Sequence, residues 1–181
     1  MSASAALSHL RSCYGLPVLR VHPGMQARLV FQSLEAVVFD LHWLGQNLVC
    51  PGEGCPACES YVARPKAFLI ATVLVGEEWR PTLVECTPQA LYRLEEQMVF
   101  DEMFVQPGTQ ALASRSAKRQ PIKFQFEGWS GETDRTLSSS HRLLSALAVL
   151  FGLPLPRRDH SVAEYKEFVR EFSCARLLSH V

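Results

Sequence analysis

The spacing of hydrophobic and polar positions differs from one part of this chain to another. In the central part, the spacing mostly predicts β-strands. Residues 66–75 form a near-continuous apolar run of strand length, and residues 79–86 form the returning strand of a hairpin around Gly76. The segment 37–42, rich in β-branched and aromatic residues, predicts an earlier strand. Apolar and polar residues alternate strictly over 122–127, which is typical of a half-buried strand. The central part of the chain is therefore predicted to be mainly β.

Helical spacing appears at three places. A threonine followed by a proline opens a helix predicted over 88–99, because threonine caps free backbone amides and proline is tolerated in the first turn. Apolar residues recur at helical spacing over 138–151, and this helix is predicted to end at Gly152. Ser161 and Glu164 form a capping box that opens a last helix, predicted to continue to the end of the chain.

This order of elements predicts a fold that is mainly β with helices. Strands, a hairpin, one helix, further strands and then two helices suit a small β-barrel with a helical tail better than alternating strand–helix units. We expect an N-terminal arm over 1–20, a β-barrel domain over 21–135 and a C-terminal helical extension over 136–181. A chain of 181 residues is long enough to bury one substantial core.

Four potential metal ligands lie within one short window. Seven residues separate His42 from Cys50, four separate Cys50 from Cys55, and two separate Cys55 from Cys58. A Cys-x-x-Cys pair can bind one ion from a single tight turn, and the intervening glycines and prolines supply the bends that bring the other two ligands round. Four nitrogen and sulfur ligands describe a closed tetrahedral site, for which zinc is the default metal. The sequence therefore predicts a structural Zn²⁺ site.

Other roles for these cysteines fit less well. A disulfide framework would spread along the chain of a secreted protein, whereas these cysteines cluster and the N-terminal segment lacks the pattern of a signal peptide. A redox Cys-x-x-Cys normally opens a helix after a strand, whereas this pair lies in a loop rich in glycine and proline. Free core thiols remain the simplest alternative, and that is the role we expect for Cys13, Cys86 and Cys174.

Composition and charge limit the possible partners. No apolar run is long enough to cross a bilayer, so we expect no membrane span and a cytoplasmic protein. The net charge is zero, with 18 basic and 18 acidic residues, so nucleic acid could be bound only through a local basic patch. Such a patch exists in the sequence, because residues 103–126 contain several lysines and arginines and no acidic residue.

Enzymatic chemistry is not indicated. A zinc nucleobase deaminase requires His-x-Glu and Pro-Cys-x-x-Cys, but Leu44 stands two residues after His42 and Gly54 precedes Cys55. Four protein ligands also leave no position for a reactive water. Neither a Walker-type phosphate loop nor a nucleophile elbow is present in the sequence. We therefore expect a non-enzymatic protein.

The region around the metal motif resembles a known family, the zinc-containing OB-fold proteins of tailed phages and related bacterial elements that bind single-stranded nucleic acid. The shared pattern consists of His42-Trp43, Cys50-Pro51, Cys55-Pro56-Ala57-Cys58, Arg64-Pro65-Lys66, an apolar strand over 68–75 and Leu83-Val84-Glu85. The resemblance covers roughly half the chain, and the residues beyond about 138 have no counterpart in it. It implies an OB-fold-like barrel in which zinc braces one loop.

The resemblance implies binding of single-stranded nucleic acid, with DNA favoured over RNA, by basic side chains and stacking aromatic rings. The expected contact residues are Trp43, Tyr61, Arg64, Lys66, Trp79, Arg115, Lys118, Arg119, Lys123 and Trp129. The alternative is a protein-interaction or adaptor module, in which the apolar faces of the C-terminal helices bind a partner protein or form a homo-oligomer. If those faces instead cover the barrel, the alternative loses its basis.

Overall fold

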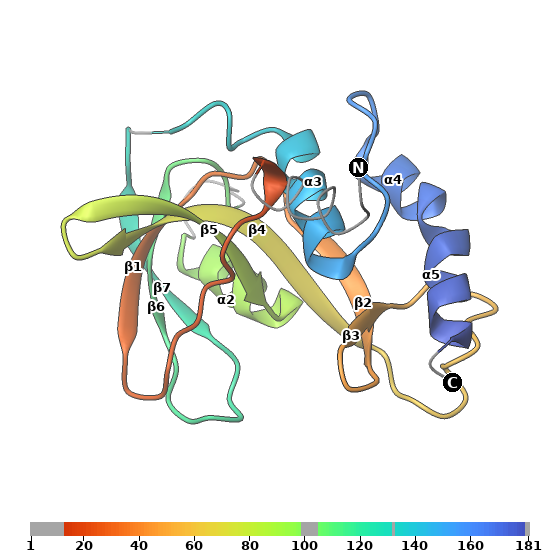
Figure 1. Cartoon of the computed structure of the whole chain (residues 1–181). Helices are drawn as coiled ribbons and strands as arrows, with labels where there is room; N and C mark the ends of the chain where they lie inside the picture. Colours follow the sequence, from red (N-terminus) through yellow and green to blue (C-terminus); the bar gives the residue numbers. More distant parts are fainter. Residues whose placement is uncertain (1–12, 99–104, 132, 180–181) are drawn as a thin grey trace.

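In the part of the chain that the structure describes, a seven-stranded antiparallel sheet forms the body of the protein, and four helices pack on it (Figure 1). The computed structural model describes residues 13–98, 105–131 and 133–179, so most of the predicted N-terminal arm lies outside the described residues. The strands are β1 (Gln26–Phe31), β2 (Val37–Trp43), β3 (Asn47–Val49), β4 (Arg64–Val75), β5 (Glu78–Cys86), β6 (Thr109–Ser114) and β7 (Lys123–Trp129). The helices are α2 (Pro88–Gln97), α3 (Ser140–Phe151), α4 (Val162–Phe168) and α5 (Arg170–Leu178). The prediction of a mainly β fold with helices is confirmed.

Strand β4 organises the sheet, because three other strands pair with it. β5 runs antiparallel along one edge of β4 over almost its whole length. The other edge of β4 is shared, since its first part pairs with β2 and its second part pairs with β1. The strand order is β3-β2-β4-β1-β6-β7, with β5 attached to β4. Among the described strands no pairing joins β7 to β5 or β3, so the sheet is open in its hydrogen bonding and the predicted barrel closure is not seen.

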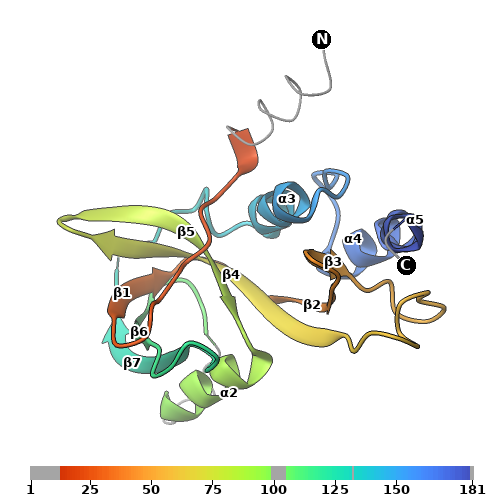
Figure 2. The ribbon, with the colours of Figure 1, turned by 60° about the horizontal axis from the view of Figure 1, so that its bottom comes forward.

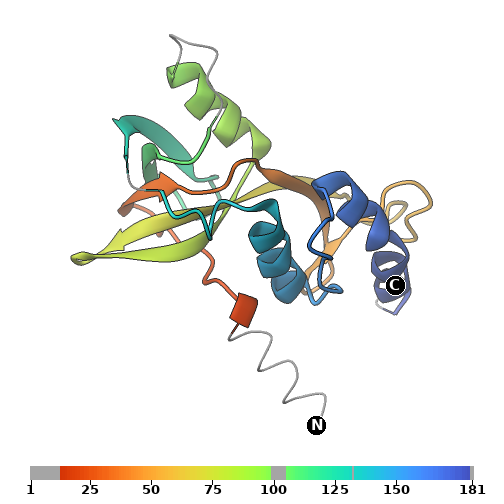
Figure 3. The same cartoon turned by 90° about the horizontal axis from the view of Figure 1, so that it is seen from above.

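The two faces of β4 lie in two different cores, because successive side chains of a strand point to opposite sides. Leu69 and Ala71 face the first core, which contains residues of β1, β6 and β7 together with the buried side of α2. Phe68 and Ile70 face the second core, which lies under α3 and α4. Figures 2 and 3 show α2 on one side of the sheet and α3, α4 and α5 on the other.

Local sequence signals explain where most helices begin and end. The side chain of Thr87 accepts a hydrogen bond from the Ala90 amide at the start of α2, and that of Ser139 accepts one from the Arg142 amide at the start of α3. Helix α3 ends at Gly152, whose φ of 61° is the left-handed conformation that favours glycine. No helix among the described residues is both long enough and apolar enough to cross a membrane.

The prediction of one continuous last helix is wrong, because the chain forms two helices that meet at Val169. Ser161 and Glu164 make the predicted capping box at the start of α4. Val169 then ends α4 and begins α5, with φ −91° and ψ −2°. The two helices have different buried partners: Tyr165 of α4 belongs to the core under α3, whereas Leu177 of α5 packs on the cysteine-rich loop. One straight helix would not reach both.

The free edge of β7 is covered by a side chain from α2. The carboxamide of Gln97 donates to the carbonyl oxygen of Phe124 over 3.1 Å and accepts from the amide of Phe126 over 2.9 Å. It thereby makes the two hydrogen bonds that a neighbouring strand would make. Exposed strand edges are sites of unwanted pairing, and this contact blocks part of one.

We predict that Gln97→Ala lowers the free energy of unfolding by about 1–2 kcal/mol, since it leaves one donor and one acceptor of β7 without their partner. Urea unfolding followed by circular dichroism measures this change. Glu96→Ala is the matched control, because Glu96 is the exposed neighbour on the same helix. An equal loss for both variants would show that the β7 contact contributes nothing.

Candidate metal centre and the adjoining groove

The hairpin of β2 and β3 positions the first two members of the candidate metal site. His42 is the penultimate residue of β2 and is fully buried, and it lies opposite Leu48 of β3. β3 turns the chain back along β2, so that Cys50, which directly follows this strand, returns to the His42 side chain. The sequence analysis did not predict β3, because three residues are too few to show a period. The turn at Gly45 followed by Leu48 and Val49 was the available signal.

The ligand atoms have the spacing of a tetrahedral metal site. His42 Nε2 lies 3.3 Å from the Cys55 Sγ and 3.7 Å from the Cys58 Sγ, and Cys50 Sγ lies 3.7 Å from Cys58 Sγ. Zn–S bonds of about 2.3 Å and Zn–N bonds of about 2.0 Å would place tetrahedral S–S and S–N pairs at about 3.8 and 3.5 Å. All three cysteines are free, and the four ligand atoms lie within 4.8 Å of one another. These residues could therefore hold one metal ion, and the predicted set is brought together.

Without an ion, the protonated form of the Cys50 and Cys58 thiols is favoured, because the pKa of each is raised. Burial raises the pKa of the Cys50 thiol to about 12, although the Gly52 amide donates a hydrogen bond to its sulfur over 3.4 Å. Burial also raises the pKa of Cys58, and the neighbouring Cys55 contributes in the same direction. The thiolate is the form that binds a metal ion, so a cation entering the site would release protons. The buried Nδ1 of His42 has no hydrogen-bond partner among the described residues.

The cysteine-rich loop is attached to the C-terminal helix. Cys55 and Ala57 of the loop, Leu48 of β3 and Leu177 of α5 form a small apolar cluster of their own. The side chain of Arg170 donates to the backbone oxygen of Glu53 over 3.1 Å. The candidate metal site therefore lies at the junction of the β2–β3 hairpin, the loop and α5, and an ion bound there would hold all three together.

A groove adjoins the metal centre and begins at the residue after the histidine ligand. Two neighbouring cavities, of 680 and 440 Å³, share Trp43, Asn47 and Lys66 among their lining residues, and we call the two cavities together the groove. Its aromatic and charged lining residues are Arg20, His22, Trp43, Tyr61, Arg64, Lys66, Glu85, Arg115 and Phe151.

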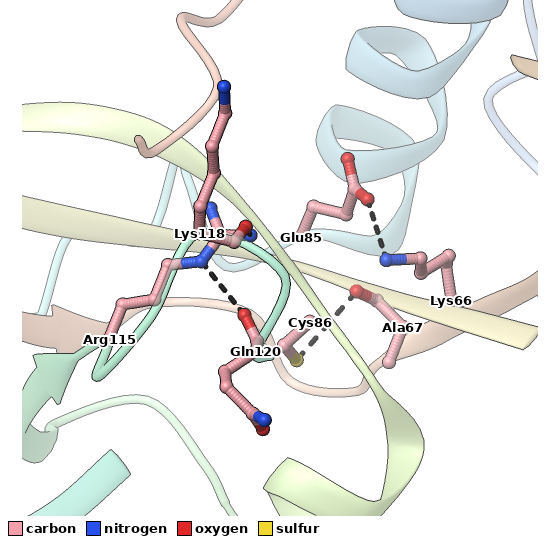
Figure 4. A network of polar contacts seen from close by, with 7 residues as sticks. All are labelled: Lys66, Ala67, Glu85, Cys86, Arg115, Lys118 and Gln120. Carbon is pink, nitrogen blue, oxygen red and sulfur yellow. Dashed lines mark hydrogen bonds and ion pairs between the residues drawn. The ribbon is translucent and has the colours of Figure 1, made fainter. Parts of the chain in front are cut away.

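Strand register explains the floor of the groove. Residues directly opposite each other in an antiparallel pair lie on the same face of the sheet. Glu85 lies opposite Phe68, and Lys66 lies opposite Phe39, so both polar side chains share the sheet face that α3 covers. They stay partly exposed because they lie beyond the C-terminal end of α3 at Phe151, which lines the groove. Lys66 and Glu85 form an ion pair of 3.1 Å (Figure 4).

The groove is basic although the chain is neutral. Four of its lining residues are basic and only Glu85 is acidic, which gives a net charge of +3 with histidine neutral. The charges come from segments that are far apart in the sequence. Arg115 is held in place, since its guanidinium donates to the backbone oxygens of Gln120 and Lys118 in the β6–β7 loop (Figure 4).

The structure separates the ten predicted nucleic-acid contact residues into groups. Trp43, Tyr61, Arg64, Lys66 and Arg115 line the groove, and the Trp43 side chain is 67 % exposed. The other five do not line it; they are Trp79, Lys118, Arg119, Lys123 and Trp129.

Two of the predicted aromatic platforms lie away from the groove. Trp79 stands at the start of β5 and lines a separate cavity with Gln32 and Thr72, whereas the groove residue Glu85 is near the other end of that strand. Trp129 ends β7, opposite Thr109, and contacts Phe126 edge-on. Both rings are partly exposed, but neither can act together with Trp43 on a short ligand.

The basic residues outside the groove are surface residues of the β6–β7 region. Lys118 and Arg119 are exposed in the loop before β7, and Lys123 is the exposed first residue of that strand. In their place the groove contains Arg20 and His22, which the sequence analysis missed. No local pattern marks these two residues. They reach the groove because the segment before β1 runs along β5, where Val18 pairs with Leu83.

We predict that the purified protein binds one metal ion per chain and that Cys55→Ala lowers the affinity for it at least about 100-fold, because three ligands cannot close the tetrahedral site. Native mass spectrometry and competition with a chromophoric chelator measure stoichiometry and affinity. Cys174→Ala is the control, since this half-buried thiol of α5 lies outside the cluster. A folded wild-type protein that takes up no ion would contradict the assignment of the site.

Comparisons with models of protein families, with curated proteins and with solved structures found no match. The resemblance of the metal motif to the zinc-containing OB-fold proteins of phages therefore stays a prediction from the sequence. The four clustered ligands and the basic groove beside them are properties of this chain's own residues.

Proposed function

We propose that this protein binds single-stranded nucleic acid in the groove, and that zinc occupies the His42, Cys50, Cys55 and Cys58 site as a structural ion. The observation that carries the proposal is the position of Trp43, an exposed ring directly after the histidine ligand, in a groove with a net charge of +3. Zinc is the metal that best suits four nitrogen and sulfur ligands in a closed tetrahedral set. DNA is favoured over RNA on the sequence resemblance alone.

The lining of the groove suits an unpaired strand better than a duplex. Bases of a single strand stack on aromatic side chains, whereas the bases of a duplex are already stacked on one another. Trp43 and Tyr61 lie together in the smaller cavity, and Arg64 and Lys66 lie beside them. The backbone phosphates of a strand stacked on these rings would meet those two cations and then Arg20 and Arg115 in the larger cavity.

The metal site supports this role by fixing the ring. His42 and Trp43 are consecutive residues at the end of β2, so an ion that holds His42 also holds the backbone of Trp43. Tyr61 follows the loop that carries Cys55 and Cys58, and its amide donates to the Ala57 carbonyl over 2.8 Å. Both stacking residues are thus positioned by the segments that supply the metal ligands. The open sheet organised by β4 is the part of the fold that we assign to an OB-like barrel.

The adaptor alternative receives less support from the C-terminal helices. Leu143, Leu144 and Leu147 of α3 are buried against the sheet, and Tyr165 of α4 is buried with them. Most of the apolar residues that the alternative requires on the surface therefore cover the protein itself. Phe168 and Phe172 stay partly exposed.

We predict that the protein binds an unstructured oligo-dT of roughly ten nucleotides and that Trp43→Ala weakens this binding about 5- to 150-fold, the range expected for the loss of one base stack. Fluorescence anisotropy with a labelled strand measures the affinity. With about four phosphate contacts in the groove, the slope of log K against log salt should be near −3.

Trp129→Ala serves as the control, because it removes another exposed tryptophan ring, which lies outside the groove. Metal content is measured for both variants, since Trp43 is next to a ligand. If oligo-dT does not bind to the zinc-loaded wild-type protein, or if the two tryptophan variants weaken binding equally, the groove is not the binding site.

A further inference from the structure

The groove contains one acidic side chain among its cations, and the proposed binding of a phosphate backbone does not explain it. Glu85 lines the larger cavity together with Trp43 and Lys66. Its side chain is 28 % exposed, so it is neither buried in the core nor free on the surface. A carboxylate in a groove for a polyanion weakens the binding of phosphates. Its oxygens would instead suit a ligand group that carries hydrogen-bond donors.

The Glu85 carboxylate keeps most of its capacity to accept hydrogen bonds. Among the described residues its partner is Lys66, whose Nζ lies 3.1 Å from Oε1 (Figure 4). An ionised carboxylate has two oxygens with about four acceptor positions. The ion pair uses one of these, so Oε1 and Oε2 can each still accept one hydrogen bond from a ligand in the groove. The ion pair also restricts the direction of the carboxylate.

The bases of an unpaired strand differ in the donors that they can offer to such a group. The Watson–Crick edge of guanine carries two adjacent donors, N1–H and N2–H, which match the two oxygens of a carboxylate. Adenine and cytosine offer one amino group next to an acceptor nitrogen. Thymine and uracil offer one N3–H between two carbonyl oxygens, which a carboxylate repels. In single strands these edges are free to be read by side chains.

We propose that Glu85 makes the groove select strands with an unpaired guanine, by accepting hydrogen bonds from guanine N1–H and N2–H at its two carboxylate oxygens. This inference rests on the proposed function of the groove and names the base that it prefers. Trp43 supplies the stacking surface, and Lys66 holds the carboxylate while its remaining hydrogens stay available to a neighbouring phosphate. The groove then combines base-independent stacking with one base-specific contact.

The test compares strands that differ at a single position. An oligo-dT of roughly ten nucleotides is compared with the same strand carrying one central guanine, adenine or cytosine, a length within the usual range of such sites. We expect the guanine strand to bind the wild-type protein at least about tenfold more tightly than oligo-dT, as for a bidentate base contact. Inosine, which lacks the N2 amino group, should lose most of this preference. The 7-deazaguanine strand should keep it, since its Watson–Crick edge is unchanged.

The decisive variant is Glu85→Gln, because its side chain has the same shape but only one acceptor oxygen. We expect the ratio of guanine-strand to oligo-dT affinity to fall to about one to three, while binding of oligo-dT becomes stronger because a negative charge has left the groove. Glu78→Gln is the matched control: it lies at the other end of β5 and pairs with Arg80 over 2.9 Å. Metal content and thermal unfolding identify any variant that fails to fold, and Glu85→Ala then provides the second measurement of the ratio.

The outcomes separate this inference from the proposed function. Equal, measurable binding of all strands by the wild-type protein would overturn the selection of guanine and leave the groove as a binding site. A preference for guanine that survives in Glu85→Gln would overturn the role of Glu85. Loss of the preference with 7-deazaguanine would also overturn it, because that result would assign the recognition of guanine to its N7 atom, where arginines bind. Failure of every strand to bind would overturn the proposed function itself.

Discussion

The hydrogen bonding of β4 is the constraint on which the rest of the structure depends. One edge of this strand belongs to β5, and the other is divided between β2 and β1. Because its side chains alternate between two faces, β4 supplies one wall to the core under α2 and one to the core under α3. A shift of its register by one residue would exchange these two sets and would also turn Lys66 away from the groove. The groove floor and both cores are therefore set by a single register.

The candidate metal centre lies where the apolar core is too small to stabilise the chain by burial alone. Around the cysteine-rich loop the buried apolar cluster is limited to Leu48, Cys55, Ala57 and Leu177. Burial of so few side chains does little to offset the conformational entropy lost in ordering a loop rich in glycine and proline. A bound ion with four protein ligands would supply the missing free energy, as structural zinc does in small domains. The positions of Trp43 and Tyr61, on either side of this region, would depend on the same contribution.

Much of this architecture is readable from the sequence wherever a pattern extends over enough residues. The strands around 66–75 and 79–86, the capped helices and the four clustered ligands carry strong local signals, and the structure has them. β3 is too short to show a hydrophobic period. The break between helices at Val169 has no signal in the sequence, because it depends on the tertiary contacts of Tyr165 and Leu177 with two different cores. The tryptophans show the same limit. Trp43 and Trp79 both lie beside a turn in the sequence, and only the strand pairing puts one in the groove and the other at the far end of β5.

The anchoring of Arg115 has a consequence for the thermodynamics of association. A flexible cation on a surface loses rotamer freedom when it captures an anion, and this loss opposes binding. The Arg115 guanidinium has already lost that freedom in the free protein, because the carbonyls of Lys118 and Gln120 hold it. Toward a ligand of the proposed kind, its charge would therefore act as a fixed field with little further entropic cost, although some of its donors are used inside the loop. The β6–β7 loop thus has an anchored cation, Arg115, at its base and two exposed cations, Lys118 and Arg119, at its tip. One short segment therefore contains a fixed source of positive potential beside two that are open to solvent.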